Sequence, residues 1–230
     1  MNVIDSSLLS FFNQFSRLSP AFDASVAFLA GSHLLKGGLL MMLLWAAWFK
    51  DEPGQALVRR RIVATLTASA VALFLARVLA AALPFRLRPL YHPDVEFVRP
   101  AGLEAVGLGS WSSFPSDHAV LFATLSIGLL VAWRPAGVFA CVYTAVCILT
   151  PRVYLGFHYP TDIVVGAAIG AMVAWVFVVR LVDVRFVRGL EATSAERPAV
   201  FYTGLFLVTY QIATMFDGTR ALAKHLWGML

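Results

Sequence analysis

Three short polar clusters carry the residue types that bind and transfer charged groups. The first is Arg86-Leu87-Arg88-Pro89, the second is Pro115-Ser116-Asp117-His118, and the third joins Arg152 to His158 and Asp162. Apolar segments long enough to cross a bilayer separate or flank the clusters. Charged side chains next to lipid are costly unless they face a protected polar cavity, so we interpret the clusters as parts of one functional site.

The spacing between the clusters predicts that they meet on one membrane face. From His118 to His158 the chain covers about forty residues, which is about the length of one helical span out, a turn and a span back. Pro115 and Pro160 suit the first turns of helices, so Ser116 is expected near a helix N-terminus. Free backbone N–H groups and the helix dipole make such an end an anion site.

The residue types favour phosphoryl transfer. The guanidinium groups of Arg88 and Arg152 match phosphate oxygens in two-point geometry. Asp162 follows His158 closely enough to orient its ring, and an oriented neutral histidine can attack phosphorus. A second histidine, His118, can protonate the departing oxygen. No metal or other cofactor is expected for this chemistry.

Composition places these clusters in a membrane protein. The chain has 230 residues, of which 60% are hydrophobic and only 13% charged, and its mean hydropathy is +0.77. Such values lie outside soluble usage. The net charge of +5 comes from dispersed basic residues beside apolar spans, which favours membrane lipids over nucleic acid as the partner.

We predict an all-α, polytopic membrane helix bundle that forms a single domain over residues 1–230. About six spans of roughly 20 residues each fit this length. The expected spans cover residues 33–49, 55–83, 115–133, 136–150, 160–182 and 199–216, after an amphipathic interfacial helix over residues 1–19. Residues 1–32 would then be an interfacial N-terminal segment, 33–182 the catalytic core, and 199–217 an additional C-terminal span. Residues 180–197 are expected to form a loop, and Gly166 and Gly170 fit close helix packing in the fifth span.

The charge pattern predicts the orientation of the chain. Alternating crossings place Arg59, Arg60 and Arg61 on one face and all three clusters on the other. The densest basic run should stay cytoplasmic. We therefore expect a multi-pass protein of the inner (plasma) membrane with its site on the extracytoplasmic face.

The three clusters resemble the signatures of the type 2 phosphatidic acid phosphatase superfamily, a family of membrane lipid phosphate phosphatases. The family pattern is Lys-x6-Arg-Pro, Pro-Ser-Gly-His and Ser-Arg-x5-His-x3-Asp, and the last two blocks match here in order and internal spacing. The resemblance covers residues 34–182. It implies a phosphohistidine at His158 supported by Asp162, with His118 as acid to the leaving group. It also implies that Arg88, Ser116 and Arg152 hold the phosphate.

The chain departs from the family pattern at three positions. Ala81 stands where the first signature has lysine, so that charge must come from elsewhere, with Arg86 or Arg77 as candidates. Asp117 replaces glycine inside the candidate phosphate site, and we expect its side chain to point away or toward an arginine. Pro151 replaces serine and removes one hydroxyl donor.

The function that the resemblance implies is hydrolysis of a lipid phosphate or diphosphate. Because the site is expected to face outward, we favour undecaprenyl diphosphate, converted to undecaprenyl phosphate. Phosphatidylglycerophosphate and phosphatidic acid stay open as substrates, as does phosphotransfer to a lipid or sugar hydroxyl.

A lipid or anion transporter would need charges deep within several spans, whereas these clusters lie at span ends. A zinc site of His118, His158, Asp117 and Asp162 is disfavoured by the nearby arginines. The sequence does not indicate an oligomeric state.

Overall fold

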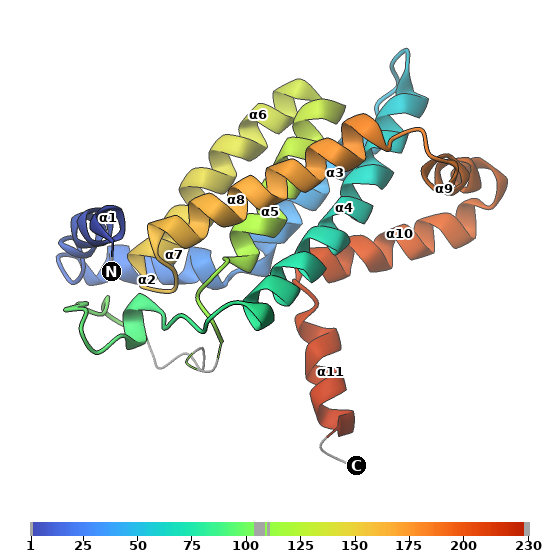
Figure 1. Ribbon diagram of the computed structural model, residues 1–230. Helices are drawn as coiled ribbons and strands as arrows, with labels where there is room; N and C mark the ends of the chain where they lie inside the picture. Colours follow the sequence, from blue (N-terminus) through green and yellow to red (C-terminus); the bar gives the residue numbers. More distant parts are fainter. Residues whose placement is uncertain (1, 104–108, 110, 228–230) are drawn as a thin grey trace.

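The computed structural model describes residues 2–103, 109 and 111–227, and over these residues it is built from helices and their connections (Figure 1). The α-helices are α1 (Val3–Asn13), α2 (Pro20–Gly31), α3 (Leu39–Trp48), α4 (Gln55–Ala82), α5 (Asp117–Ala132), α6 (Arg134–Tyr143), α7 (Thr150–Tyr154), α8 (Pro160–Trp175), α9 (Arg185–Glu196), α10 (Pro198–Ala213) and α11 (Asp217–Trp227). Three π-helical segments, η1 (Leu34–Gly38), η3 (Thr144–Leu149) and η4 (Val176–Arg180), and one 3₁₀ turn, η2 (Pro89–Tyr91), complete the order. The predicted all-α class is confirmed.

Helix α5 lies at the centre of the bundle. It packs against α4, α6 and α8, and most of its side chains are buried, including the large Phe122 and Leu125. An apolar helix without a polar face is expected at such a place, because neighbours cover it on all sides. The position of α5 matters because its first turn carries Asp117 and His118.

Close packing between α5 and α8 depends on two glycines. A Cβ on Gly166 would lie 2.9 Å from the Ser116 carbonyl oxygen, and a Cβ on Gly170 would lie 2.2 Å from that of Val120. The prediction that these glycines allow close helix packing is therefore confirmed. The contact fixes the start of α5 against the start of α8, where Ser116 N donates to the Asp162 backbone oxygen at 3.3 Å.

The structure contains fewer candidate membrane spans among its described residues than the six predicted from sequence. Three helical segments, Gln55–Ala82, Arg134–Tyr154 and Pro160–Arg180, are long and apolar enough to cross a bilayer. Two bent pairs, Pro20–Gly31 with Leu34–Trp48 and Pro198–Ala213 with Asp217–Ala223, raise the number to five if each pair is one span. Asp117–Ala132 is apolar but shorter. The count of six and the interfacial placement of the N-terminal helix stay predictions.

Two segment predictions were wrong. The fourth span does not stop at Thr150: it continues through η3 and α7 to Tyr154, which places Arg152 on a helix. Proline lacks the N–H that a regular helical turn would use, and the π-helical segment before Pro151 accommodates it. The expected loop over residues 180–197 contains α9.

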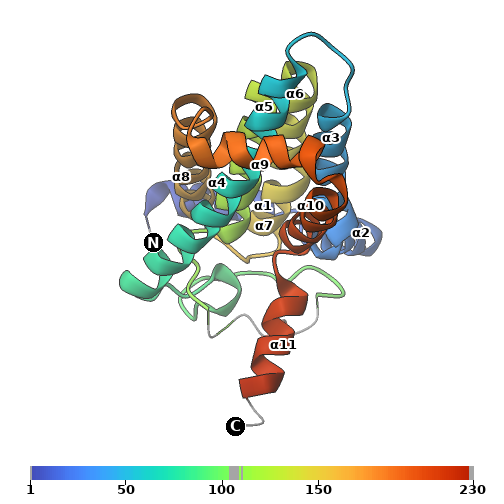
Figure 2. The same ribbon diagram turned by 90° about the vertical axis from the view of Figure 1, so that its right-hand side faces the viewer.

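All three clusters lie at one end of the bundle. The end of α4, the start of α5, the end of α7 and the start of α8 meet there, close to α1 and α2 (Figures 1 and 2). The turn between α3 and α4 lies at the opposite end. The alternation of spans that was predicted from sequence therefore returns the polar residues to a common place.

Candidate active site

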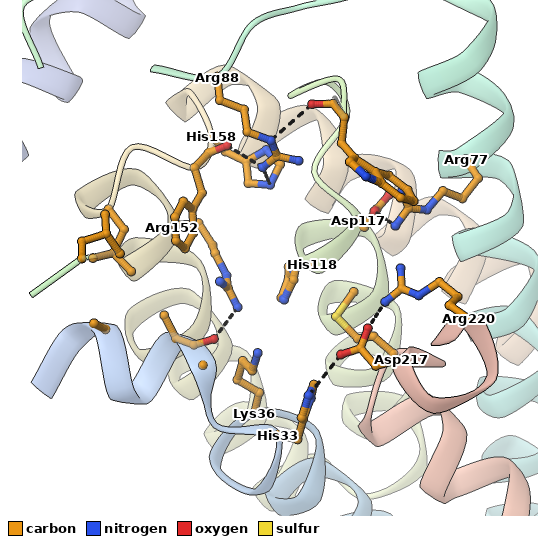
Figure 3. Close-up of a pocket in the computed structure, with 18 residues that line it drawn as sticks. His33, Lys36, Arg77, Arg88, Asp117, His118, Arg152, His158, Asp217 and Arg220 are labelled. Atoms are coloured by element: carbon orange, nitrogen blue, oxygen red, sulfur yellow. Dashed lines mark hydrogen bonds and ion pairs between the residues drawn. The ribbon is translucent and has the colours of Figure 1, made fainter. Parts of the chain in front are cut away.

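A cavity of about 490 Å³ opens at the end of the bundle where the clusters meet (Figure 3). Six of the nine predicted site residues line it, four of them being Arg88, His118, Arg152 and His158. Arg77 and Asp117 line it as well, whereas Arg86, Ser116 and Asp162 are not among its described lining residues. The structure thus brings side chains from all three clusters to one cavity.

A tight turn after α7 carries His158 into this cavity. Gly156 adopts a left-handed conformation with φ of 69°, which suits glycine, and the chain then folds back on α7. The N–H groups of Phe157 and His158 both donate to the Arg152 backbone oxygen, at 2.9 and 3.2 Å. His158 and Arg152 are therefore held together by the backbone of the third cluster.

The hydrogen bonds of His158 define its tautomer. Its Nδ1 lies 2.7 Å from the Ser113 carbonyl oxygen and its Nε2 lies 3.2 Å from a terminal nitrogen of Arg88. A carbonyl only accepts and a guanidinium only donates, so Nδ1 carries the proton and Nε2 the lone pair. Burial lowers the pKa of His158 to about 4, against the opposing effect of Asp162. The ring is neutral near pH 7, as a nucleophile requires.

Asp162 acts on His158 indirectly. Its Oδ2 lies 3.8 Å from His158 Nδ1, too far for a hydrogen bond. The same oxygen accepts from Ser113 Oγ at 2.5 Å and from the Tyr159 N–H at 2.8 Å. Asp162 thus anchors Ser113, whose carbonyl holds the imidazole. Sequence reasoning missed Ser113, because no family signature or spacing marks it.

Arg86 does not point into the cavity. Its guanidinium forms ion pairs with Asp162 at 2.5 Å and with Asp5 of α1 at 2.7 Å. Burial alone would raise the pKa of Asp5, but hydrogen bonds from Thr161 and Arg86 outweigh it and lower that pKa. The charge of Arg86 is therefore matched by two buried carboxylates, and its phosphate contact stays a prediction.

Arg88 is a buried cation without a carboxylate partner among the residues that the structure describes. It donates to the backbone oxygens of Phe157 at 2.7 Å and Trp111 at 3.3 Å, both neutral acceptors. Burial lowers the pKa of Arg88, which reflects the cost of holding this charge away from water. A bound anion beside His158 would remove that cost.

The residues of the second cluster have different positions: Ser116 caps α5, whereas Asp117 and His118 line the cavity. Ser116 is fully buried and caps α5, its hydroxyl accepting from the Ala119 N–H at 3.4 Å. Asp117 forms an ion pair with Arg77, whose guanidinium also lies over the Trp111 ring at 4.5 Å. The side chain of Asp117 is thus directed toward an arginine, as expected. His118 lines the cavity between the other polar groups (Figure 3).

Arg152 is also buried without a carboxylate partner. It donates to the Ala30 carbonyl oxygen of α2 at 2.8 Å, and its Nε has no hydrogen-bond partner among the described residues. An unsatisfied buried donor is uncommon in a folded protein and points to an absent ligand.

Four polar residues outside the clusters complete the cavity wall. Asp217 contacts His33 at 3.1 Å and also forms an ion pair with Arg220. Lys36 of η1 lines the cavity too and is buried. No sequence signal marked these residues, because they come from the first and last spans, outside the family signatures. Within the described chain, no three His, Cys, Asp or Glu side chains gather as a metal site would require.

These features define a cavity with two histidines and several basic side chains at the end of a membrane helix bundle. Residues 62–185 match the model of the PAP2 superfamily, and the chain belongs to that family. The resemblance to type 2 phosphatidic acid phosphatases is thereby confirmed.

Curated relatives act on lipid phosphates according to their names. The chain is 28% identical to "Putative undecaprenyl-diphosphatase YbjG" of Escherichia coli, over 73% of this chain and 77% of the relative. It is 30% identical to "Lipid A 1-diphosphate synthase" of Escherichia coli, over 78% of each chain. It is 34% identical to "Lipid A 4'-phosphatase" of Bacteroides thetaiotaomicron, over 42% of this chain and 47% of the relative. No solved structure matches the chain.

Proposed function

We propose that this protein hydrolyses undecaprenyl diphosphate to undecaprenyl phosphate at the extracytoplasmic face of the plasma membrane. One observation carries the reaction: the neutral Nε2 of buried His158 lies beside Arg88, a cation without a carboxylate partner, in a cavity shared with His118. The relatives named for undecaprenyl diphosphate and lipid A phosphates support a phosphorylated lipid as substrate.

The proposed reaction has two steps. His158 Nε2 attacks the terminal phosphorus, and the bond from phosphorus to the bridging oxygen breaks. His118 gives a proton to that oxygen, so lipid phosphate leaves and a phosphohistidine remains. Water then attacks the phosphohistidine with His118 as base, which releases inorganic phosphate and restores His158. Arg88 and Arg152 stabilise negative charge on the oxygens of the transferred group.

The positive charges at the other end of the bundle support the proposed orientation. Arg59, Arg60 and Arg61 lie in the first turns of α4, at the end opposite the cavity, and Arg60 forms an ion pair with Asp183. Basic residues are enriched on the cytoplasmic side of membrane proteins. The cavity would then face outward, where a lipid carrier that has delivered its cargo is found.

Phosphotransfer is the second candidate reaction. The 30% identity to a protein named lipid A 1-diphosphate synthase favours it, because the name describes a phosphorylated lipid product. In that case a lipid hydroxyl or phosphate, rather than water, would accept the phosphoryl group from His158. Phosphatidylglycerophosphate and phosphatidic acid are further substrate candidates.

Phosphate release by the purified protein tests the proposal. In detergent with EDTA, the wild type should release phosphate from undecaprenyl diphosphate faster than from phosphatidic acid or phosphatidylglycerophosphate. His158→Ala should lower the rate by at least about 10⁴-fold, because the nucleophile is lost. His92→Ala, which changes a histidine outside the cavity lining, serves as the control and should keep full activity.

Two results would overturn the proposal. Unchanged turnover by His158→Ala would exclude the phosphohistidine, and dependence on added metal would exclude the metal-free reaction. Phosphorylated lipid A or another phosphorylated acceptor in place of free phosphate would identify a phosphotransferase.

A further inference from the structure

Lys36 is a buried cation that the proposed reaction leaves without a role. Only 4% of its surface is exposed, and it lines the cavity from η1. Its ammonium group makes no hydrogen bond or ion pair with any residue in the part of the chain that the structure describes. A lysine is rarely buried in this way unless it is paired, and an anion bound in the cavity would pair with the ammonium group of Lys36.

The backbone around Lys36 is held in place. A Cβ on the next residue, Gly37, would lie 2.2 Å from the Ala213 carbonyl oxygen of α10, so η1 and α10 are in direct backbone contact. The segment is π-helical, a geometry that is often found at functional sites. Lys36 therefore cannot turn out of the bundle without separating these two elements.

The charges that line the cavity fall into two groups. Arg77 and Arg220 are neutralised by Asp117 and Asp217. The other three cations, Arg88, Arg152 and Lys36, have no carboxylate partner among the described residues. A phosphate monoester carries a charge of about −1.5 to −2 at neutral pH, and a second phosphate group adds further charge. Three unpaired cations therefore suit a diphosphate better than a monophosphate.

The arrangement of the side chains separates two subsites. Figure 3 shows Arg88 and His158 on one side of the cavity, Lys36 on the opposite side, and His118 between them. The charged groups that affect Lys36 are Arg152 and Asp217, and not Arg88 or His158. If the terminal phosphate of a diphosphate lies at His158, the bridging oxygen lies near His118. The second phosphate then lies near Lys36.

We infer that Lys36 binds the second phosphate of a lipid diphosphate, the one that remains on the lipid. The inference rests on the proposed function. When His158 attacks the terminal phosphorus, the bridging oxygen leaves as part of the lipid phosphate, and Lys36 stabilises the negative charge of that leaving group. Arg152 lies close to both phosphates. The subsite makes the cavity selective for diphosphates over monophosphates.

The variant Lys36→Met tests this role, because methionine has an unbranched side chain that is one atom shorter and carries no charge. Farnesyl diphosphate and farnesyl monophosphate are suitable substrates because they have the same lipid tail. In the variant, kcat/KM should fall about 30-fold or more for the diphosphate and less than about 3-fold for the monophosphate. Lys50→Met is the matched control: Lys50 lies outside the cavity and pairs with the exposed Glu52, so both activities should be unchanged.

Ligand binding gives a readout that does not depend on turnover. Methylenediphosphonate should raise the thermal unfolding temperature of the wild type but not that of Lys36→Met, whereas inorganic phosphate should act equally on both. Without ligand, the variant should unfold at the same temperature as the wild type or higher, since an unpaired buried cation is removed. Lys36→Gln provides a second neutral variant if the methionine variant does not fold.

The outcomes separate the two proposals. Equal losses on both farnesyl substrates would show that Lys36 holds the transferred phosphate and would overturn the inference, as would no loss on either. A wild type that releases no phosphate from any lipid would refute the proposed function. In that case a diphosphonate effect that is lost in Lys36→Met would still support the subsite, and its persistence would overturn it.

Discussion

At the scale of single residues, pairing decides which basic side chains are free to bind substrate. Arg77 and Arg86 both belong to the region of the first signature, and both are matched by carboxylates. Arg88 and Arg152 contact only backbone oxygens and the imidazole of His158. Both candidates for the charge of the lysine that Ala81 replaces, Arg77 and Arg86, are thus already paired, whereas Lys36 is one of three cavity cations without a carboxylate partner among the described residues.

The contacts of Arg86 predict a structural effect of its loss. In Arg86→Met, the buried carboxylates of Asp5 and Asp162 lose their shared cation, which should destabilise the protein by about 3 kcal/mol. Since Ser113 and His158 depend on Asp162, kcat should fall while KM for the lipid changes less than about 3-fold. Thermal unfolding in detergent and steady-state kinetics measure the two effects.

A second substitution checks the cause. Adding Asp5→Asn to Arg86→Met should recover part of the stability, because one uncompensated carboxylate is removed. A raised KM with unchanged stability would instead place Arg86 at the phosphate, as the sequence had suggested.

The sequence could indicate the residues that keep a fixed spacing within one signature. His118, Arg152 and His158 were found in this way, since spans of known length return them to one face. Lys36 and Asp5 could not be found, because they reach the site through packing of the N-terminal helices against distant segments. Ser113 acts through its backbone oxygen, which no residue type reveals.

At the scale of elements, the contact between α5 and α8 sets the geometry of the site. The two helices contribute His118, the acid of the proposed reaction, and the carboxylate Asp162, and they touch through Gly166 and Gly170. Close approach of backbones at glycine is a common way for helices to pack in membranes. The register of this contact therefore determines the distance between groups from the second and third clusters.

A larger side chain at Gly170 should separate the two helices. In Gly170→Val, the new Cβ would meet the Val120 carbonyl oxygen, which cannot move without its helix. We expect the free energy of unfolding to fall by about 3 kcal/mol and most of the activity to be lost. Gly204→Ala on α10 is the control: no atom lies within 4 Å of its Cβ, and alanine should be neutral or slightly stabilising. Thermal unfolding of both variants in detergent measures the difference, and equal stability would contradict the packing account.

Helix boundaries were harder to predict than helix positions. Proline at position 151 suggested the end of a span, yet the helix passes through it with a π-helical segment beforehand. Residues 180–197 are polar enough to suggest a loop, but they contain the amphipathic α9. In both cases tertiary packing overrides a local signal.

At the scale of the whole molecule, α5 is a short helix at the centre of the bundle. Its 16 residues span about 24 Å, whereas the hydrocarbon core is about 30 Å thick, and α4 has 28 residues. The helix is apolar on all sides and enclosed by α4, α6 and α8. The enclosed helix holds His118 of its first turn at the wall of the cavity.

The overall architecture could be predicted from composition and hydropathy because a membrane leaves few alternatives to helices. The exact number of spans could not, since α2 is bent by 64° from the helix that follows it and α11 by 86° from the helix before it. Whether such bent pairs cross the membrane depends on their surroundings rather than on their residues.

A phosphorylated His158 is the most direct test of the proposed mechanism. Purified protein is mixed with undecaprenyl diphosphate that is labelled in its terminal phosphate. The reaction is stopped with alkali within milliseconds, and the protein is digested for mass spectrometry. We predict label on the peptide that contains His158, with the same label in the His92→Ala control and none in His158→Ala. Label on any other residue would contradict the mechanism.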